Sequence, residues 1–373
     1  MNLNLASRWS KVAVAVVVTV VGLIAANQLN ITGSNAAYNY GYYGGGQNLA
    51  IITGAGPGGG PHIQVINPAS LGLIGSFMAP EPPGNYAGGT YVARGDLNGN
   101  GTTAEIAIGE LGVVKIRNAN GTPPTNDFTP YSGFNGETRV ATGDLDGDGK
   151  AEIITAAGPG GGPHIRAFKA DGSDVTAYPG TLGSPGIFAY GSAFSGGVYV
   201  TTADLNSDGK AEIITGAGAG GGPHVRAFNA DGTPFAGVLG NGFFAYGASF
   251  NGGVRVAAGY LNNTLGMTIV TGAGPGGGPH VREFGLNGLP VAGQAGAGWY
   301  AYGANFAGGV FVALGDIDAD EPAEIVTGAG AGGGPHVRVF KANGTAAPGV
   351  LGEGFFAYAQ NFTGGVTVAA GKV

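Results

Sequence analysis

The stretch Gly196–Phe250, GGVYVTTADLNSDGKAEIITGAGAGGGPHVRAFNADGTPFAGVLGNGFFAYGASF, decides the fold. It contains four short segments rich in β-branched and aromatic residues, VYVTT, AEIIT, HVRAF and FFAYG, separated by residues that favour turns. The Asp231–Gly232 pair after the third segment is typical of a tight hairpin turn. Glycine every few residues penalises a helix, so the stretch predicts four antiparallel strands.

The loop between the second and third of these strands recurs along the chain. Its first copy, GAGPGGGPH at 54–62, fits the G-x-G-x-x-G pattern of a dinucleotide-binding loop, but the strand-like HIQVI follows where that motif needs a helix. The loop therefore marks a repeat and predicts no nucleotide site. A sixth, divergent copy has the loop shortened to GELG, with Val113 in place of histidine. The five full copies occupy 54–62, 156–164, 216–224, 272–280 and 328–336.

The two ends of the repeat region complement each other. The first unit begins at its second strand, NLAIITGAG, and the final GGVTVAAGKV from Gly364 is a first strand without a second. Joining them leaves no sheet edge between the first and last units. The sequence thus predicts an all-β, six-bladed β-propeller of four-stranded blades, closed by pairing of the N- and C-terminal strands. The expected blades are 48–87 plus 364–373, 88–135, 136–195, 196–251, 252–307 and 308–363.

The N-terminus has the layout of a targeting segment. Arg8 and Lys11 precede an uncharged apolar run from Val12 to Ala26. As a helix this run would span roughly 22 Å, shorter than the ~30 Å hydrocarbon core of a bilayer. We expect residues 1–26 to be a signal peptide or a membrane anchor helix and 27–47 to be a Gly/Tyr/Asn-rich linker. This predicts a secreted or cell-surface protein that contacts a membrane only through residues 12–26, if they are uncleaved.

Composition narrows the class of protein. Of 373 residues, 79 are glycine, yet 43% are apolar and can form a core. The formal net charge is −7, which argues against a nucleic-acid partner because such a partner calls for a basic face. There is no cysteine, so neither a disulfide framework nor a thiolate metal site is expected.

Acidic loops between the first and second strands predict calcium sites. In DLDGDGKAE, from Asp144 to Glu152, oxygen ligands at positions 1, 3, 5, 7 and 9 surround one point, as a hard cation requires. The flanking strands and the last acid at position 9 exclude an EF-hand. YLNNTLGMT in the fifth unit has lost the ligands, and Glu321 replaces the expected glycine in DIDADEPAE. The candidate ligands are Asp144, Asp146, Asp148, the Lys150 carbonyl and Glu152; Asp204, Asn206, Asp208, Lys210 and Glu212; Asp316, Asp318, Asp320 and Glu324; and Asp96, Asn98, Asn100 and Glu105.

The run GG-V-x-V-x-x-x-D-L-[DN]-x-D-G-K-A-E-I-[IV]-T-G-A-G resembles the FG-GAP repeat, also grouped with VCBS repeats, of integrin alpha-subunit propellers and bacterial surface proteins. The resemblance covers roughly residues 48 to 373. It implies that calcium binds between strands one and two, and that the loop containing Gly216–Gly218 lies on the opposite face. Three features differ from the family. Gly196 replaces the phenylalanine of the name, position 9 of the acidic loop is glutamate where the family usually has aspartate, and six blades are expected here whereas integrin propellers have seven.

All five histidines occupy one position of the repeat, at the start of the third strand: His62, His164, His224, His280 and His336. A metal shared between blades is excluded, because equivalent loops lie well off the axis and two nitrogens on one zinc must lie about 3.5 Å apart. Two interpretations remain. His224, Arg226 and Phe228 alternate along one strand face and pack blade against blade, or the histidines face a ligand.

The function expected from these features is an exported, calcium-stabilised binding or adhesion module for an extracellular protein or glycan. Equivalent loops on one face suit multivalent weak contacts. A passive surface-coat protein is the alternative, and a propeller hydrolase is a further one. The charged positions outside the repeat pattern, Glu110, Glu137 and Glu283, form no recognisable catalytic group, so the sequence predicts no enzyme.

Overall fold

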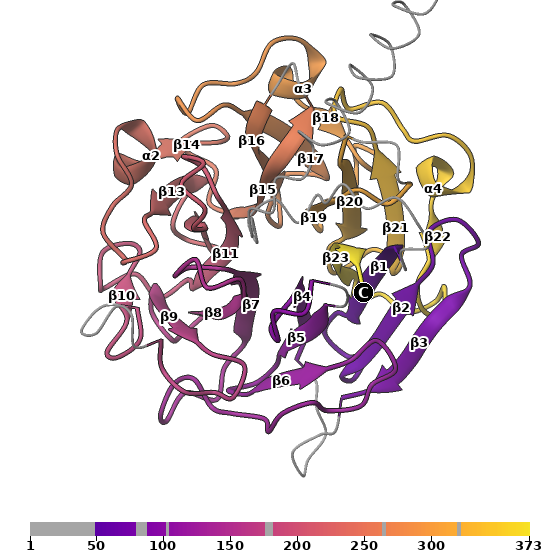
Figure 1. Ribbon diagram of the computed structural model, residues 1–373. Helices are drawn as coiled ribbons and strands as arrows, with labels where there is room; N and C mark the ends of the chain where they lie inside the picture. The colour runs from indigo at the N-terminus through magenta and orange to yellow at the C-terminus, as the bar shows by residue number, and fades with distance from the viewer. Residues whose placement is uncertain (1–48, 80–87, 102–103, 176–181, 263–265, 319–321) are drawn as a thin grey trace, which may run out of the picture. The chain divides into compact units, whose positions relative to one another are not determined.

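A computed structural model describes residues 49–79, 88–101, 104–175, 182–262, 266–318 and 322–373. The expected signal or anchor helix at 1–26 and the linker at 27–47 lie outside these ranges. Over the described residues the chain forms six antiparallel sheets arranged around one axis, which is a six-bladed propeller (Figure 1). None of the helices in these ranges has the length and apolar character needed to cross a bilayer.

Each blade begins with an innermost strand at the axis and continues outward in chain order (Figure 1). Blade 1 is the exception in sequence, because its innermost strand comes from the C-terminal end of the chain. The blades are as follows: blade 1, β23 (Val366–Lys372), β1 (Leu49–Ala55), β2 (His62–Ile66) and β3 (Leu73–Met78); blade 2, β4 (Tyr91–Gly95), β5 (Glu105–Gly109) and β6 (Val114–Arg117); blade 3, β7 (Thr138–Gly143), β8 (Glu152–Ala157), β9 (His164–Phe168) and β10 (Ile187–Phe188); blade 4, β11 (Val198–Ala203), β12 (Glu212–Ala217), β13 (His224–Phe228) and β14 (Phe243–Phe244); blade 5, β15 (Val254–Asn262), β16 (Gly266–Ala273), β17 (His280–Phe284) and β18 (Trp299–Tyr300); blade 6, β19 (Val310–Gly315), β20 (Glu324–Ala329), β21 (His336–Phe340) and β22 (Phe355–Phe356).

The ends of the repeat region pair as the sequence predicts. Strand β23 lies antiparallel to β1 in a continuous register from Leu49 opposite Lys372 to Ala55 opposite Val366. The Thr367 hydroxyl also donates to the backbone oxygen of Thr90 in blade 2, at 2.6 Å. The strands from the two ends of the repeat region therefore share one sheet, blade 1, and the ring closes through it.

Blade 2 corrects the expectation of four strands in every blade. Within the described residues it has three, and the only trace of a fourth is an isolated bridge between Val114 and Phe128. The segment in question contains Pro123, Pro124 and Pro130, and proline has no N–H to donate to a ladder. One-turn helices precede the fourth strands of blades 4, 5 and 6, which the sequence did not predict: α2 (Val238–Asn241), α3 (Gln294–Ala297) and α4 (Val350–Glu353).

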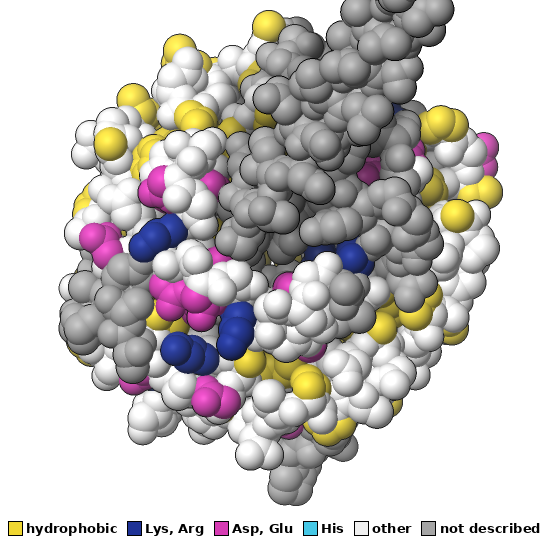
Figure 2. Space-filling view, in the orientation of Figure 1, with side chains coloured by type: hydrophobic (Ala, Val, Ile, Leu, Met, Phe, Trp, Pro, Cys, Tyr) yellow, Lys and Arg dark blue, Asp and Glu magenta, His cyan; other side chains and the backbone are white. Residues whose placement is uncertain are grey.

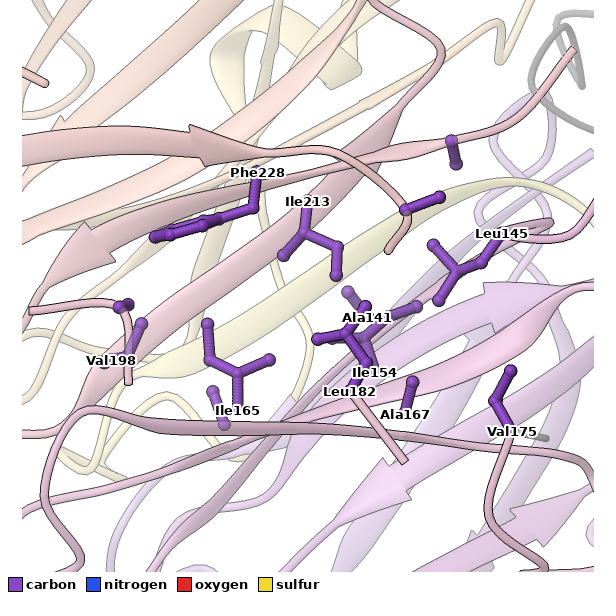
Figure 3. Close-up of a cluster of buried hydrophobic side chains, with 14 residues drawn as sticks. Ala141, Leu145, Ile154, Ile165, Ala167, Val175, Leu182, Val198, Ile213 and Phe228 are labelled. Atoms are coloured by element: carbon purple, nitrogen blue, oxygen red, sulfur yellow. The ribbon is translucent and has the colours of Figure 1, made fainter. Parts of the chain in front are cut away.

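The hydrophobic core lies between adjacent blades. In the cluster of Figure 3, Ile154, Ile165 and Leu182 of blade 3 pack with Val198 and Ile213 of blade 4, and all five are fully buried. Complete burial of such a side chain contributes about 2–3 kcal/mol. Packing of this kind repeats around the ring and holds each blade against the next.

The glycine loops bring backbone against backbone. A Cβ on Gly218 would lie 2.0 Å from the carbonyl oxygen of Gly196, and the Gly218 N–H donates to the Gly197 carbonyl at 2.9 Å. Gly220 has a φ of 91°, which disfavours any other residue. The loop then leads into strand β13, so its glycines serve close packing within the propeller.

Candidate functional site

The acidic loop of blade 3 joins β7 to β8 and brings its carboxylates together. Asp144, Asp146 and Glu152 each offer an oxygen, and these oxygens lie within 4.8 Å of one another. Asp144 is buried and accepts from the backbone N–H groups of Gly147 and Gly149, at 2.7 and 2.9 Å. Glu152 accepts from the Leu145 N–H at 2.8 Å. The loop is thus wrapped around its own acids, in an arrangement that could hold a metal ion.

The electrostatics of this cluster fit a cation. The pKa of Glu152 is raised to about 8, mainly by burial, with a smaller contribution in the same direction from Asp146, Asp144 and Asp148 and an opposing one from the Leu145 N–H. Burial also raises the pKa of Asp144. A bound divalent cation would favour the ionised form of these carboxyl groups and offset the repulsion between them. A set of ligands made only of oxygen atoms suits a hard cation.

Blade 4 repeats the geometry with an amide in place of one acid. Glu212 is buried and accepts from the Leu205 N–H at 2.7 Å, and Asp204 accepts from the Gly209 N–H at 3.0 Å. The Asn206 side-chain nitrogen donates to Asp208 at 3.0 Å and to Glu212 at 3.2 Å. Burial raises the pKa of Glu212 to about 7. Rotation of the Asn206 amide would present its oxygen to a cation instead.

In blade 6 a lysine ammonium lies among the acids. Asp316, Asp318 and Glu324 form a second cluster with oxygens within 4.8 Å of one another. Lys341 Nζ, at the end of the third strand, lies 2.9 Å from Asp318 and 3.0 Å from Glu324. Asp320 lies outside the described residues. The sequence reasoning missed Lys341, although a basic residue directly after HVRVF was visible.

The loop of blade 2 has the same fold with fewer charges. Asp96 accepts from the N–H groups of Gly99 and Gly101, at 2.8 and 2.7 Å, and Glu105 accepts from that of Leu97 at 3.0 Å. The Asn98 amide donates to Glu105, and Asn98 in turn accepts from the Asn100 N–H. In blade 5, whose loop lacks the acidic ligands, the β15–β16 ladder extends further, to the pair Asn262 and Gly266.

The acidic loops also connect neighbouring blades. The Ala151 N–H of blade 3 donates to the Asp96 carbonyl of blade 2 at 2.8 Å, and the Ala211 N–H of blade 4 donates to the Asp144 carbonyl at 2.7 Å. Figure 2 shows acidic and basic side chains side by side over β7–β13, with no histidine visible on that face. A cation in one loop would therefore stiffen the contact with the next blade.

Each histidine lies at the opposite end of its blade, between two aromatic rings. His224 lies 5.0 Å from the Phe244 ring of its own fourth strand and 5.6 Å from the Tyr190 ring of blade 3. His164, His280 and His336 have the same two neighbours, and His62 packs on Tyr358. Burial lowers the pKa of all five imidazoles, so they are neutral at neutral pH.

The arginine two residues after each of four histidines joins blades. Arg226 donates from Nη1 to the Ala189 carbonyl of blade 3 at 2.6 Å, and from Nε to the Gly240 carbonyl of its own blade at 2.9 Å. Arg166, Arg282 and Arg338 make equivalent bonds. The tyrosine of each FAYG segment adds a bond to the next blade, as Tyr190 does to the His224 carbonyl at 2.8 Å. These side chains hold the ring together.

Pockets form beside the histidines at equivalent places. One, of about 320 Å³, is lined by Tyr190 and Phe194 from blade 3 and by His224 and Arg226 from blade 4. Its equivalent between blades 4 and 5 has about 330 Å³. At four of the histidines an aromatic ring of the fourth strand is partly exposed to solvent, with exposed fractions of 53% for Phe188, 52% for Phe244, 52% for Tyr300 and 43% for Phe356, whereas Met78 pairs with His62 in blade 1.

The three glutamates outside the repeat pattern do not meet in one site. Glu110 is buried and pairs with Lys115 at 2.6 Å. Glu137 accepts from the Tyr91 hydroxyl at 2.9 Å. Glu283 lies in the interior of blade 5.

Comparisons with known proteins agree with this architecture. Residues 144–215, from the start of the acidic loop of blade 3 into β12 of blade 4, match the family described as FG-GAP-like repeat. No curated protein matches the sequence. A solved protein of unknown function from Bacteroides caccae is 13% identical, with 86% of this chain and 98% of that one covered at a TM-score of 0.52.

Two enzymes are among the other solved structures with some likeness. The dihydro-heme d1 dehydrogenase NirN is 12% identical over 83% of this chain and 55% of its own, at a TM-score of 0.38. The exotype rhamnogalacturonan lyase YesX is 13% identical over 81% and 54%, at a TM-score of 0.30. At such identities the likeness to solved structures concerns the fold alone. The matched segment and the six-bladed ring together fit an FG-GAP-type repeat family.

Proposed function

We propose that this chain is an exported, calcium-stabilised propeller that acts as a cell-surface or extracellular binding or adhesion module. The observation that carries the proposal is the recurrence of one pocket at one repeat position, with about 320 Å³ beside His224 and about 330 Å³ beside His280. Equivalent pockets repeated around a ring can each bind weakly and still give a high combined avidity.

The pocket chemistry favours a glycan over a protein as ligand. At four histidines a half-exposed aromatic ring of the fourth strand packs on the neutral imidazole, at ring centroid distances of 4.8 to 5.0 Å. At His224 and His280 the same imidazole also lines the pocket. Sugar rings present C–H faces that pack on such aromatic surfaces, while their hydroxyls need donors and acceptors nearby. Arg226 already bonds backbone carbonyls, so its role here is to fix the pocket wall.

Calcium would support this role through the acidic loops. The clusters at Asp144, Asp146 and Glu152 and at Asp316, Asp318 and Glu324 have donor sets that suit it. Because a bound ion stabilises only the folded chain, it raises stability by mass action. The pockets open on the other end of the blades, so the ion would act on the scaffold and the ligand would bind elsewhere.

Glycan-array and pull-down binding of a triple variant, Phe244→Ala, Tyr300→Ala and Phe356→Ala, tests the proposal. We expect avidity to fall by at least about tenfold, because three repeated contacts are lost. The matched control removes three exposed apolar side chains away from the histidines, by Val238→Ala, Leu289→Ala and Val350→Ala, and should bind as the parent does. Capture of proteins without glycan binding would point to the protein ligand. A parent chain that binds neither would be a passive coat, and the proposal would be wrong.

A further inference from the structure

One position of the innermost strands holds an aromatic residue in blades 2, 4 and 6, an arginine in blades 3 and 5 and a threonine in blade 1. It is the second residue after the residue pair that opens each blade, which is Gly-Gly in five blades and Gly136–Glu137 in blade 3, and it is the first or second residue of the strand. From blade 2 to blade 1 its occupants are Tyr91, Arg139, Tyr199, Arg255, Phe311 and Thr367. We call these six residues the axial plug.

The aromatic members come from blades 2, 4 and 6 and meet at the centre of the ring. The ring centroid of Tyr91 lies 6.5 Å from that of Tyr199 and 6.2 Å from that of Phe311, and the last two are 6.4 Å apart. Three rings from alternate blades at nearly equal separations form a triangle around the axis. They close one end of the channel through the propeller.

The arginines stand between the rings. Arg139 Cζ lies 3.7 Å from the Tyr199 centroid and 5.5 Å from that of Tyr91. Arg255 Cζ lies 3.8 Å from the Phe311 centroid and 5.7 Å from that of Tyr199. Their exposed fractions are only 4% and 5%. Two guanidinium groups are therefore buried against the same tyrosine ring.

The charge of the plug is not balanced by its described neighbours. The carboxylate in contact with it is Glu137, which accepts from Arg139 Nη2 at 3.1 Å and from Tyr91. Two guanidinium groups against this one carboxylate leave one positive charge in excess. Arg139 Nε and Nη1 and Arg255 Nε are buried without an acceptor. Buried charges in proteins are normally paired and their donors satisfied.

The tyrosines respond to this positive field. Burial acts to raise the pKa of Tyr199, but Arg139 and Arg255 outweigh it, and the pKa of Tyr199 lies below its ordinary value. The pKa of Tyr91, beside Glu137, is raised by burial. The region that favours negative charge is thus on the side where the two arginines meet the Tyr199 ring.

We propose that the axial plug is a binding site for a small monovalent carboxylate, held by the free N–H groups of Arg139 and Arg255. One negative charge balances the excess, and a carboxylate accepts planar guanidinium donors well. A cavity of about 200 Å³ begins at the next residue of the same strands, at Val92, Val140 and Val200, and leaves room for the uncharged part of the molecule. This site is separate from the histidine pockets and does not depend on the function proposed for them.

Thermal unfolding of the full chain in a halide-free and carboxylate-free buffer, at matched ionic strength, tests the site. The probes are sodium acetate, sodium glucuronate, sodium sulfate and uncharged glucose. We expect acetate and glucuronate to raise the unfolding midpoint saturably, by about 2–4 °C at concentrations about a hundredfold above Kd. Glucose should have no effect, and the divalent sulfate should be weaker.

Variants separate this site from a general salt effect. Arg139→Gln and Arg255→Gln should each abolish the saturable shift, whereas Lys169→Gln, which removes one positive charge from the outer part of blade 3, should keep it. Glu137→Gln removes the competing carboxylate and should tighten acetate binding about tenfold. The proposal is overturned if the parent shows no saturable response, if all variants respond alike, if sulfate binds more tightly than acetate, or if Glu137→Gln weakens binding.

Discussion

Glu283 offers the sharpest test of the described interior, because it is a carboxyl group placed where other blades have small apolar side chains. The same position of the third strand holds Ala167, Ala227 and Val339 in blades 3, 4 and 6. Glu283 has no exposed surface, and neither of its carboxylate oxygens has a hydrogen-bond partner. Burial raises its pKa to about 8, and the nearby Trp299 indole opposes that shift only in part.

The sign of the effect on stability follows from this shift. The ordinary pKa of a glutamate is near 4.5, so the folded chain holds the proton more tightly than the unfolded chain does. The contribution of Glu283 is therefore most favourable below about pH 4.5, and stability is lost as the pH rises through the window up to about 8. At about 1.4 kcal/mol per pH unit, the loss across the window is on the order of 5 kcal/mol.

Glu283→Gln keeps the shape and removes the titration. Urea unfolding of parent and variant at several pH values should give similar free energies near pH 4.5 and a difference that grows with pH, in favour of the variant, to several kcal/mol near pH 8. Glu353→Gln, at an exposed glutamate, is the control and should follow the parent. Parallel pH profiles for parent and Glu283→Gln would show that Glu283 is hydrated or paired in the folded chain and would refute the reasoning.

Three further outcomes follow from the loops and the blade contacts. Asp146→Asn should weaken calcium binding at blade 3 by about tenfold or more, seen as fewer bound ions by elemental analysis and a smaller drop in unfolding midpoint on adding chelator; an unchanged ion count would contradict the site. Lys341→Ala frees Asp318 and Glu324, so the variant should bind one calcium more tightly than the parent in a calorimetric titration, and equal affinities would exclude competition by the ammonium group. Arg226→Ala removes the donors to the Ala189 and Gly240 carbonyls and should cost about 3–5 kcal/mol in urea unfolding, with little recovery in Arg226→Lys. A loss below about 0.5 kcal/mol, the usual range for a surface substitution, would show that blade contacts do not depend on Arg226.

Closure of the ring was predictable from the sequence, because the repeats at the two ends of the chain are each missing a strand that the other supplies. The repeat that begins at Leu49 lacks a first strand, and the repeat that begins at Val366 lacks a second. Each can complete its backbone hydrogen bonds by pairing with the other, and β1 and β23 pair in this way. The acidic loop of blade 3 was predictable for a similar reason. Acids at alternate positions followed by glycine must turn back on themselves, and Asp144 accepts from Gly147 and Gly149.

Features that depend on contacts between distant residues were not predictable. The third-strand lysine Lys341 reaches the acids of its own blade only because the two loops meet in space. Pro123, Pro124 and Pro130 disfavour a fourth strand in blade 2, but the repeat pattern by itself predicts four strands in every blade. The unpartnered carboxyl of Glu283 follows from packing on every side, which a single strand pattern does not contain.

The alternation of aromatic and non-aromatic residues in the axial plug limits the design of a propeller from identical consensus repeats. Three aromatic rings at 6.2 to 6.5 Å already fill the centre, so six copies of one unit carrying tyrosine at that place would collide, and six carrying arginine would repel one another. The smallest building block that can be copied without change is therefore a pair of blades, one with an aromatic residue and one without, used three times.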